Sequence, residues 1–345
     1  MPNFDTGHLF LTFLTPIKGG SEALAMGGMA SHEQIVKTVL GLLPTALQSP
    51  ATRDIGENSP FCRNRQTHLC RYMVLDDVTY NGRTAKNALV ASIQGQDPIH
   101  PQPVDRLNAA YLMFAADIDA VMDEGDPLPA HLDPDQQAWV RDAYLRRLWT
   151  TMQPELRSIY RHCYGFEAVT SAEDFAAYMA RCQIETTLPF NDYWIAPPTL
   201  SNLPIKALGI VAATPVVAAL LGLIGVVLGL STAPVLGWIT GWGSGATALI
   251  GTLVSVAVLY GVYRYVMANG QNPMPPAKYG DLPSVLKSLY LQQTFADFTV
   301  ESQGQSPEAL HAAFGHYIDN HKPADKMAPS QAPGVISIAA EGGVI

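Results

Sequence analysis

The residues best suited to chemistry lie in two short stretches of the sequence. His68 and Arg71 belong to the first stretch, and His162 and Cys163 belong to the second. An imidazole can act as a general base or bind a metal, and an arginine can stabilise an anion. A cysteine activated by a histidine base can act as a nucleophile. These four side chains are therefore the candidate catalytic residues.

Each candidate also has a plainer structural interpretation. Side chains alternate between the two faces of a strand, so His68 and Arg71 point in opposite directions if their strand is regular. We favour a histidine bonded to a backbone carbonyl and an arginine paired with Asp76 or Asp77. Cys163 needs a histidine base that is close in space, which the sequence alone does not supply.

Other catalytic and metal-binding motifs are absent from the sequence. It contains no G-x-G-x-x-G, Walker A, H-E-x-x-H or G-x-S-x-G motif, and no C-x-x-C pair. Three histidines of the C-terminal region recur every five residues, which spreads them around a helix: His311, His316 and His321. The sequence therefore predicts no metal site, and the four cysteines are expected to be reduced thiols.

The charge of the chain is acidic and unevenly distributed. Its 21 Lys and Arg residues against 30 Asp and Glu residues give a net charge of −9. This balance argues against nucleic-acid binding, which needs a basic surface. No Asp, Glu, Lys, Arg or His occurs between Ala207 and Tyr263. That stretch is expected to lie in a lipid bilayer.

Two apolar runs that cover most of this stretch are long enough to cross a membrane. Ala207–Leu230 and Ala246–Met267 are separated by a connection rich in Gly and Trp, and each exceeds or approaches the roughly 20 residues that span a bilayer core. Lys206 precedes the first run and Arg264 lies near the end of the second. The positive-inside rule then predicts an inner (cytoplasmic) membrane protein with two spans and both termini in the cytoplasm. A buried hairpin of a soluble protein is the disfavoured alternative.

Three glycines lie close to one face of the first span and are expected to allow close helix packing: Gly222, Gly225 and Gly229. We favour packing between the two spans of one chain over packing between chains. No ionisable side chain interrupts either span, so an anchor is favoured over a transporter. A pore-forming effector is a third and weaker hypothesis.

The chain is expected to consist of an α+β domain over residues 1–199, the membrane hairpin over 200–268 and a C-terminal region over 269–345. Hydrophobic periodicity and capping residues predict the elements of the first domain. The expected strands are 8–14, 67–75, 87–94, 109–114 and 185–194, and the expected helices are 32–43, 134–160 with a kink at Pro154, and 172–182.

The C-terminal region is expected to form a partial second α+β unit. Residues 293–300 are predicted to form a strand, and 307–320 a helix capped by Ser306. A second short strand is expected at 335–339. Because such a half-unit cannot bury its own apolar surface, we expect it to dock on the N-terminal domain or on another subunit.

The predicted order of strand, helix, strand, strand, helix and strand is that of the ferredoxin-like motif. Three segments, Leu11–Lys18, Ser59–Phe61 with Thr67–Asp77, and Tyr160–Phe166, resemble a loosely characterised group of bacterial ferredoxin-like proteins. The resemblance covers residues 8–170, with an apparent insertion at 79–107. These proteins are similar to the dimeric α/β-barrel superfamily, which includes dye-decolourising peroxidases and chlorite dismutases.

The resemblance implies two functional hypotheses. The first is a membrane-anchored ferredoxin-like accessory or assembly protein, whose partners are the bilayer and either further copies of itself or other membrane or redox subunits. The alternative is a peroxidase-type oxidoreductase that acts on a peroxide or a lipid-derived substrate. In that alternative haem is the implied cofactor, and His162 or His68 is its ligand by analogy.

Overall fold

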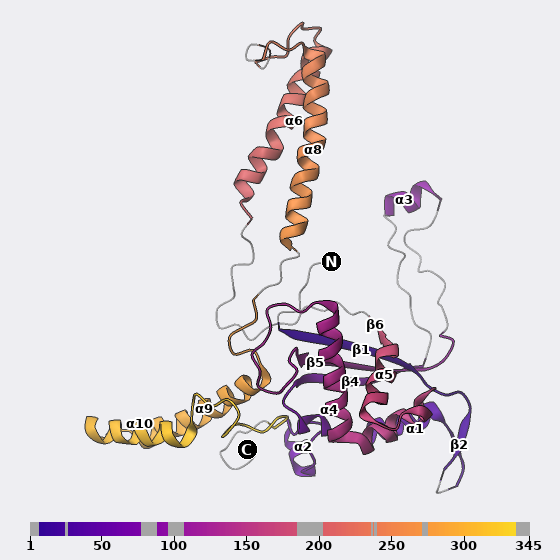
Figure 1. Ribbon diagram of the computed structural model, residues 1–345, viewed down its shortest axis with the longest axis vertical. Coiled ribbons are helices and arrows are strands. Elements are labelled where there is room, and N and C mark those ends of the chain that lie inside the picture. The colour runs from indigo at the N-terminus through magenta and orange to yellow at the C-terminus, as the bar shows by residue number, and fades with distance from the viewer. Residues whose placement is uncertain are drawn as a thin grey trace. The chain divides into compact units, whose positions relative to one another are not determined.

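The computed structural model describes residues 7–24, 27–76, 88–95, 107–184, 203–235, 237, 240–270 and 275–335 (Figure 1). The chain divides into two compact units. One unit contains helices α6 (Ile205–Val227) and α8 (Ser244–Gly270), and the other contains all the remaining elements described below. The fold is therefore mixed α+β, with one four-stranded antiparallel sheet and two long apolar helices.

The main sheet has the strand order β4-β5-β1-β6, and every neighbouring pair is antiparallel. Its strands are β1 (His8–Pro16), β4 (Thr67–Leu75), β5 (Tyr111–Asp119) and β6 (Gln183–Ile184). His8 lies opposite Asp119 and Phe13 opposite Phe114 in the β1–β5 register. A separate two-stranded ribbon joins β2 (Ser21–Ala23) to β3 (Met29–Ser31).

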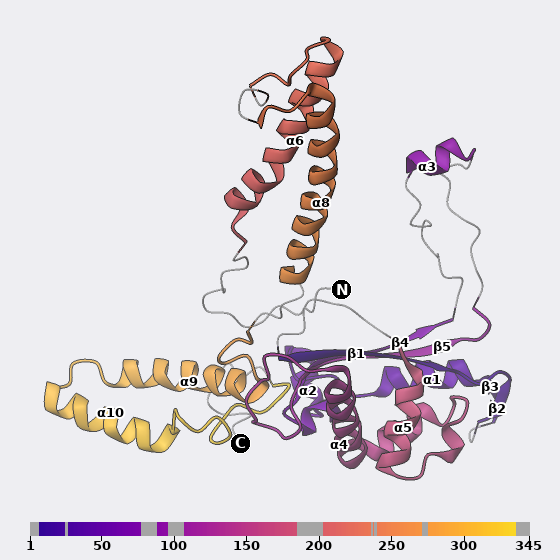
Figure 2. The same ribbon diagram turned by 45° about the horizontal axis from the view of Figure 1, so that its top comes forward.

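Three helices lie on one side of the main sheet (Figure 2). They are α1 (His32–Leu42), α4 (Pro134–Tyr160) and α5 (Ala172–Cys182). Each begins with a capping box, formed by Ser31, Asp133 and Ser171 respectively, because these side chains accept a bond from a backbone N–H that the helix leaves unpaired. The predicted kink of α4 is confirmed, since Met152 leaves the helical conformation next to Pro154.

The hydrophobic core lies between these helices and the sheet. Alternate residues of β1 and β5 point into it, and they pack against the inner faces of α4 and α5. Burial of each large apolar side chain contributes about 1.5–3 kcal/mol to stability. The largest fully buried side chains include Phe13, Phe114, Tyr144, Leu148, Tyr160 and Phe175. This core holds the strand ends at fixed positions.

Two sequence predictions in the N-terminal region need correction. The strand predicted at 87–94 is wrong, because Ala88–Ile93 forms helix α3, as its Ala and Leu content favours. The strand predicted at 109–114 starts later and runs further, to Asp119. The closing strand predicted at 185–194 lies outside the described residues, and β6 precedes it.

The C-terminal region differs from the predicted half-unit. The strand predicted at 293–300 is wrong, since these residues belong to α9 (Leu282–Glu301). Asp281 caps this helix, and Leu282, Leu286 and Tyr290 are buried at a spacing of four residues, which is a helical period. The predicted second helix is confirmed as α10 (Pro307–His321). Of the strand predicted at 335–339 only Val335 is described, in a single bridge to Leu47.

The remaining described elements are short. They are the helix α2 (Pro50–Ile55) and the 3-10 turns η1 (Pro60–Arg63) and η2 (Phe166–Ala168). They connect the strands and helices of the α+β unit. Ser49 and Gly56 cap the two ends of α2, and Gly165 precedes η2.

Helices α6 and α8 pack closely along their length. A Cβ atom at Gly222 would overlap the backbone of Ala248, and one at Gly225 would lie 2.5 Å from the Ser244 hydroxyl oxygen. Gly229 differs from the prediction, because it follows the end of α6 with a φ of 67° and no atom lies within 4 Å of its Cβ position. It permits a turn that other residues disfavour and takes no part in packing.

Candidate functional site

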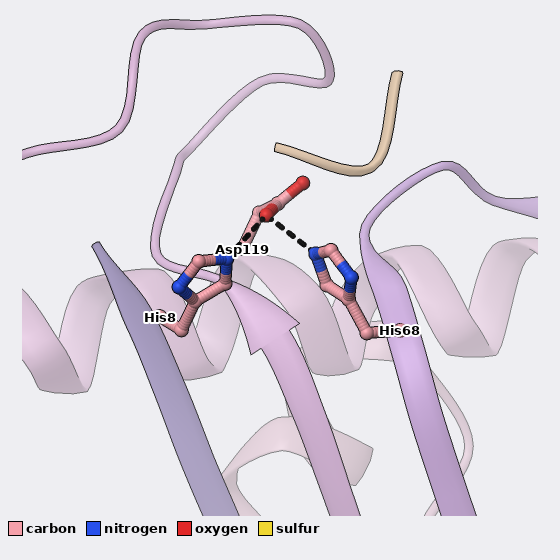
Figure 3. Close-up of side chains that lie close together, drawn as sticks. All are labelled: His8, His68 and Asp119. Carbon is pink, nitrogen blue, oxygen red and sulfur yellow. Dashed lines mark hydrogen bonds and ion pairs between the residues drawn. The ribbon is translucent and has the colours of Figure 1, made fainter. Parts of the chain in front are cut away.

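Three neighbouring strands bring two imidazoles and a carboxylate together at one end of the main sheet (Figure 3). His8 is the first residue of β1, Asp119 is the last of β5, and His68 is the second of β4. The Nε2 atom of His68 lies 2.7 Å from Oδ1 of Asp119, and Nε2 of His8 lies 3.3 Å from the same oxygen. We call this group the strand-end cluster.

A β-bulge alters the direction of His68. The register of β4 against β5 shifts between Thr67 and Leu69, so the strand is irregular at His68. The expectation that His68 and Arg71 point to opposite faces assumed a regular strand, and it fails here. His68 bonds Asp119, which follows the core residue Ile118, and Arg71 precedes Tyr72, which packs against the core. Both His68 and Arg71 therefore lie on the face that points away from the core.

The start of α9 closes the strand-end cluster from the C-terminal side. The backbone N–H of Leu282 donates a 2.8 Å hydrogen bond to Oδ2 of Asp119, and Nε2 of His8 lies 3.3 Å from the carbonyl oxygen of Gly280. The approach is tight at Gly7, where a Cβ atom would lie 2.9 Å from that of Pro276. Asp119 therefore links the sheet to the first turn of α9.

The strand-end cluster is shielded from solvent. The side chains of His8, His68 and Asp119 are each 1% exposed. Burial alone raises the pKa of the Asp119 carboxyl, but the hydrogen bonds with His68 and His8 outweigh burial and hold the pKa below its ordinary value. Asp119 is therefore a buried carboxylate anion at neutral pH.

A cavity of about 500 Å³ adjoins this cluster on the side of His68. Its walls come from β4, the end of α1, the first half of α9 and the segment 331–335. They are predominantly apolar. A volume of this size accommodates a small organic molecule. Lining residues include Leu40, Phe61, His68, Arg71, Leu286 and Leu289.

A second cluster of the same residue types lies elsewhere in the α+β unit, and we call it the ribbon cluster. Glu22 comes from β2, His32 from the start of α1, and His162 from the turn after α4. The Nδ1 atoms of His32 and His162 are 3.0 Å apart, and Oε2 of Glu22 lies 3.7 and 3.5 Å from them. Glu22 is half exposed, whereas the side chain of His162 is 1% exposed.

Hydrogen bonding fixes the proton of His162. Nε of Arg161, which is always a donor, lies 2.9 Å from Nε2 of His162. Nε2 therefore accepts, and the neutral ring carries its proton on Nδ1 and donates it to Nδ1 of His32. Burial, followed by the charge of Arg161, lowers the pKa of His162 to about 4, so the ring is neutral at pH 7.

This arrangement does not fit His162 as a haem ligand. An axial ligand needs an accessible nitrogen lone pair. Nε2 of His162 accepts from Arg161, Nδ1 contacts His32, and the side chain is buried. Both ring nitrogens of His162 therefore already have hydrogen-bond partners, and neither is open to an iron atom.

Cys163 occupies an ordinary structural position, whereas Arg71 lines the cavity beside the strand-end cluster. The Cys163 thiol is buried and donates to the Thr15 hydroxyl at 3.7 Å. Burial raises the pKa of this thiol to about 12, which is opposite to the lowered pKa of a nucleophilic cysteine. Asp76, one of the partners expected for Arg71, is bound by Lys37, and Asp77 lies outside the described residues.

Sequence reasoning identified one member of each cluster and missed the others. His68 and His162 were among the candidates, but His8, Asp119 and His32 were not. The signal available for His8 and Asp119 was their position at strand ends, because the start of one antiparallel strand lies beside the end of its neighbour. No protein-family model, curated protein or solved structure matches the chain.

Proposed function

We propose that the chain is a membrane-anchored accessory or assembly protein. In this proposal α6 and α8 form a transmembrane hairpin in the inner membrane, both termini are cytoplasmic, and the α+β unit is held at the cytoplasmic surface. The unit associates there with further copies of the chain or with other membrane or redox subunits. The bilayer is the first partner.

The single observation that carries this proposal is the composition and packing of the hairpin. Both helices are long and apolar enough to cross a membrane. Their small residues face each other, whereas large apolar side chains such as Leu223 and Leu253 are more than half exposed. A soluble unit would bury such side chains, but a bilayer solvates them.

The strand order supports a ferredoxin-like assignment of the α+β unit. The order β4-β5-β1-β6 with helices on one face is the order that a βαββαβ chain gives in that motif. The opposite face of the sheet exposes Leu69 and Met73. Apolar side chains on a free sheet face favour contact with a partner, which supports an assembly role.

Fractionation and labelling test the anchor and its orientation. The protein should remain in the membrane pellet after carbonate extraction. In intact spheroplasts, a membrane-impermeant maleimide should label Ser231→Cys, in the connection between the helices, and not Gln305→Cys, between α9 and α10. Recovery of folded protein in a detergent-free supernatant overturns the anchor, and the reverse labelling pattern overturns the orientation.

A matched pair of glycine variants tests the hairpin packing. Gly222→Leu forces a side chain into the backbone of α8, whereas Gly209→Leu, on the same helix, meets no atom within 4 Å at its Cβ position. Thermal unfolding in detergent should occur at a clearly lower temperature for Gly222→Leu and be unchanged for Gly209→Leu, because overpacking costs about 1–3 kcal/mol or more. Equal behaviour of the two variants contradicts the packing.

Native mass spectrometry of gently solubilised membranes tests the assembly role. We expect a homo-oligomer or a complex with a second membrane protein. A strictly monomeric chain at the concentration found in the membrane would remove assembly from the proposal and leave only the anchor.

A further inference from the structure

We propose that His8, His68 and Asp119 bind one divalent transition-metal ion. Nε2 of each histidine and Oδ1 of the aspartate are the ligand atoms. Two imidazoles and one carboxylate are a ligand set typical of Zn²⁺, Fe²⁺ and related ions, whereas Ca²⁺ and Mg²⁺ prefer oxygen ligands alone.

The distances fit a shared ion. All three ligand atoms lie within 4.8 Å of one another, and the two nitrogens lie 2.7 and 3.3 Å from the carboxylate oxygen. Ligands bound at about 2.1 Å in octahedral or tetrahedral geometry are separated by about 3.0–3.4 Å. The two nitrogen–oxygen distances therefore need shifts of only a few tenths of an ångström to admit the ion.

The orientation of the ligands is set by the fold. Each comes from a different strand of one sheet, and the register places His8 directly opposite Asp119. The hydrogen bond from Leu282 to Oδ2 turns Oδ1 of Asp119 toward the two imidazoles. Such outer contacts to a ligating carboxylate pre-organise metal sites.

Burial strengthens the attraction for a cation. The three side chains are almost fully buried, so the Asp119 carboxylate attracts an ion that enters the cluster more strongly than a carboxylate at the surface would. The carbonyl oxygen of Gly280, 3.3 Å from Nε2 of His8, has the spacing of a fourth ligand. The cavity lined by His68 lies beside the cluster.

The ribbon cluster also combines two histidines with one carboxylate, but both ring nitrogens of His162 are engaged by neighbouring side chains. Nδ1 of His162 carries a proton because Arg161 occupies the other nitrogen. The charge of Arg161 also lowers the pKa of His162 and acts against a metal ion, and the opposing effect of Glu22 is smaller. His32 therefore supplies a matched control in the same unit.

The competing explanation of the strand-end cluster is a purely structural network, in which both histidines donate Nε2–H to Asp119. Metal binding requires that each Nε2 lose its proton, either to solvent or to Nδ1 of the same ring. The two explanations thus differ in a measurable way, namely uptake of an ion by the stripped protein.

Cobalt and zinc titrations of the full-length chain in detergent test the proposal. After removal of metal with EDTA, Co²⁺ should produce visible d–d absorption that saturates at one ion per chain, and Zn²⁺ should displace it. X-ray absorption of the Co²⁺ complex should show only nitrogen and oxygen ligands. A wild-type chain that gives no such absorption and no heat of Zn²⁺ binding overturns the proposal.

Variants locate the ion. His68→Ala and Asp119→Asn should each weaken Zn²⁺ binding by more than the roughly 10- to 100-fold that loss of an outer-shell partner costs, whereas His32→Ala should leave the affinity unchanged. Near-ultraviolet circular dichroism checks that each variant is folded. If His68→Ala is unstable, Asp119→Asn still tests the proposal, because asparagine keeps the shape of the aspartate side chain. Unchanged affinity in both strand-end variants, or loss of binding in His32→Ala, assigns the ion elsewhere and overturns the proposal.

Discussion

The strand-end cluster and the ribbon cluster each combine two histidines with one carboxylate, but they differ in what surrounds these groups. In the strand-end cluster the acid is Asp119, which is buried and bonded to the backbone at Leu282. In the ribbon cluster the acid is Glu22, which is half exposed, and the buried group is the imidazole of His162. The same functional groups, two imidazoles and a carboxylate, are therefore solvated in opposite ways.

This difference decides which group is charged. Partners of Asp119 stabilise its anionic form, whereas burial and Arg161 stabilise the neutral form of His162. The strand-end cluster thus holds a buried carboxylate anion, whereas the ribbon cluster holds the neutral imidazole of His162 beside the Arg161 cation. The composition of a cluster does not by itself distinguish a cation site from a hydrogen-bonded pair. The hydrogen-bond donors around the cluster make this distinction.

The largest expected difference is in the free energy of unfolding. Asp119→Ala removes the carboxylate that accepts from Leu282 N–H and lies beside both imidazoles, although His8 keeps the Gly280 carbonyl oxygen as a partner. Each buried donor that loses its acceptor costs about 1–3 kcal/mol. We expect the metal-free protein to lose about 3 kcal/mol or more, whereas Glu22→Ala should change stability by less than about 0.5 kcal/mol. Chemical denaturation in the presence of EDTA measures both.

Asp119→Asn serves as the control for this comparison, because it retains one acceptor oxygen while removing the charge. Its free energy of unfolding should lie between that of the wild type and that of Asp119→Ala. Equal stabilities of Asp119→Ala and Glu22→Ala would show that burial of the acid does not distinguish the two clusters.

The sequence predicted the helices and the core strands better than it predicted the site. The caps Ser31, Asp133 and Ser171 were predicted correctly because capping is a local interaction. The two long apolar helices were also predicted, because their composition is a local property of the sequence. The clusters depend on strand register and strand ends. The expected strand 109–114 stopped before Asp119, so the pairing of Asp119 with His8 was not visible.

The bulge at His68 is a second reason why the sequence did not predict the strand-end cluster. A regular alternation of side chains separates His68 from Arg71, whereas the register shift that turns His68 depends on pairing with β5. The strand wrongly predicted at 293–300 has a similar origin. Its aromatic and β-branched residues resemble a strand, but the helical period begins upstream at Leu282, where the contact with Asp119 forms.

A smaller effect should appear in the pH dependence of stability. The pKa of His162 is about 4 in the folded chain and about 6.5 when unperturbed. Between these values the unfolded chain binds a proton that the folded chain does not, so the free energy of unfolding falls as pH falls from 6.5 to 4. With solvent screening we expect a loss on the order of 1–2 kcal/mol.

Denaturation at pH 7 and at pH 4.5 measures this loss. His162→Gln should flatten the profile in that window, and His311→Gln, at an exposed position of α10, should leave it unchanged. A wild-type profile that is already flat, or equal flattening by both variants, contradicts the assignment of the neutral imidazole to His162.

The smallest and most local effect concerns Arg161. Arg161→Gln removes the charge that is the second-largest cause of the low pKa of His162, while burial, the largest cause, remains. The pKa of His162 should therefore rise but stay below 6.5, as followed by the imidazole proton resonances in NMR. Because Nε2 then loses its arginine donor, the Nδ1–H tautomer should also lose its preference, which the ¹⁵N shifts report. Arg157→Gln, one turn earlier on α4, is the control and should move neither signal, whereas an unchanged His162 resonance in Arg161→Gln would mean that the arginine does not hold the ring neutral.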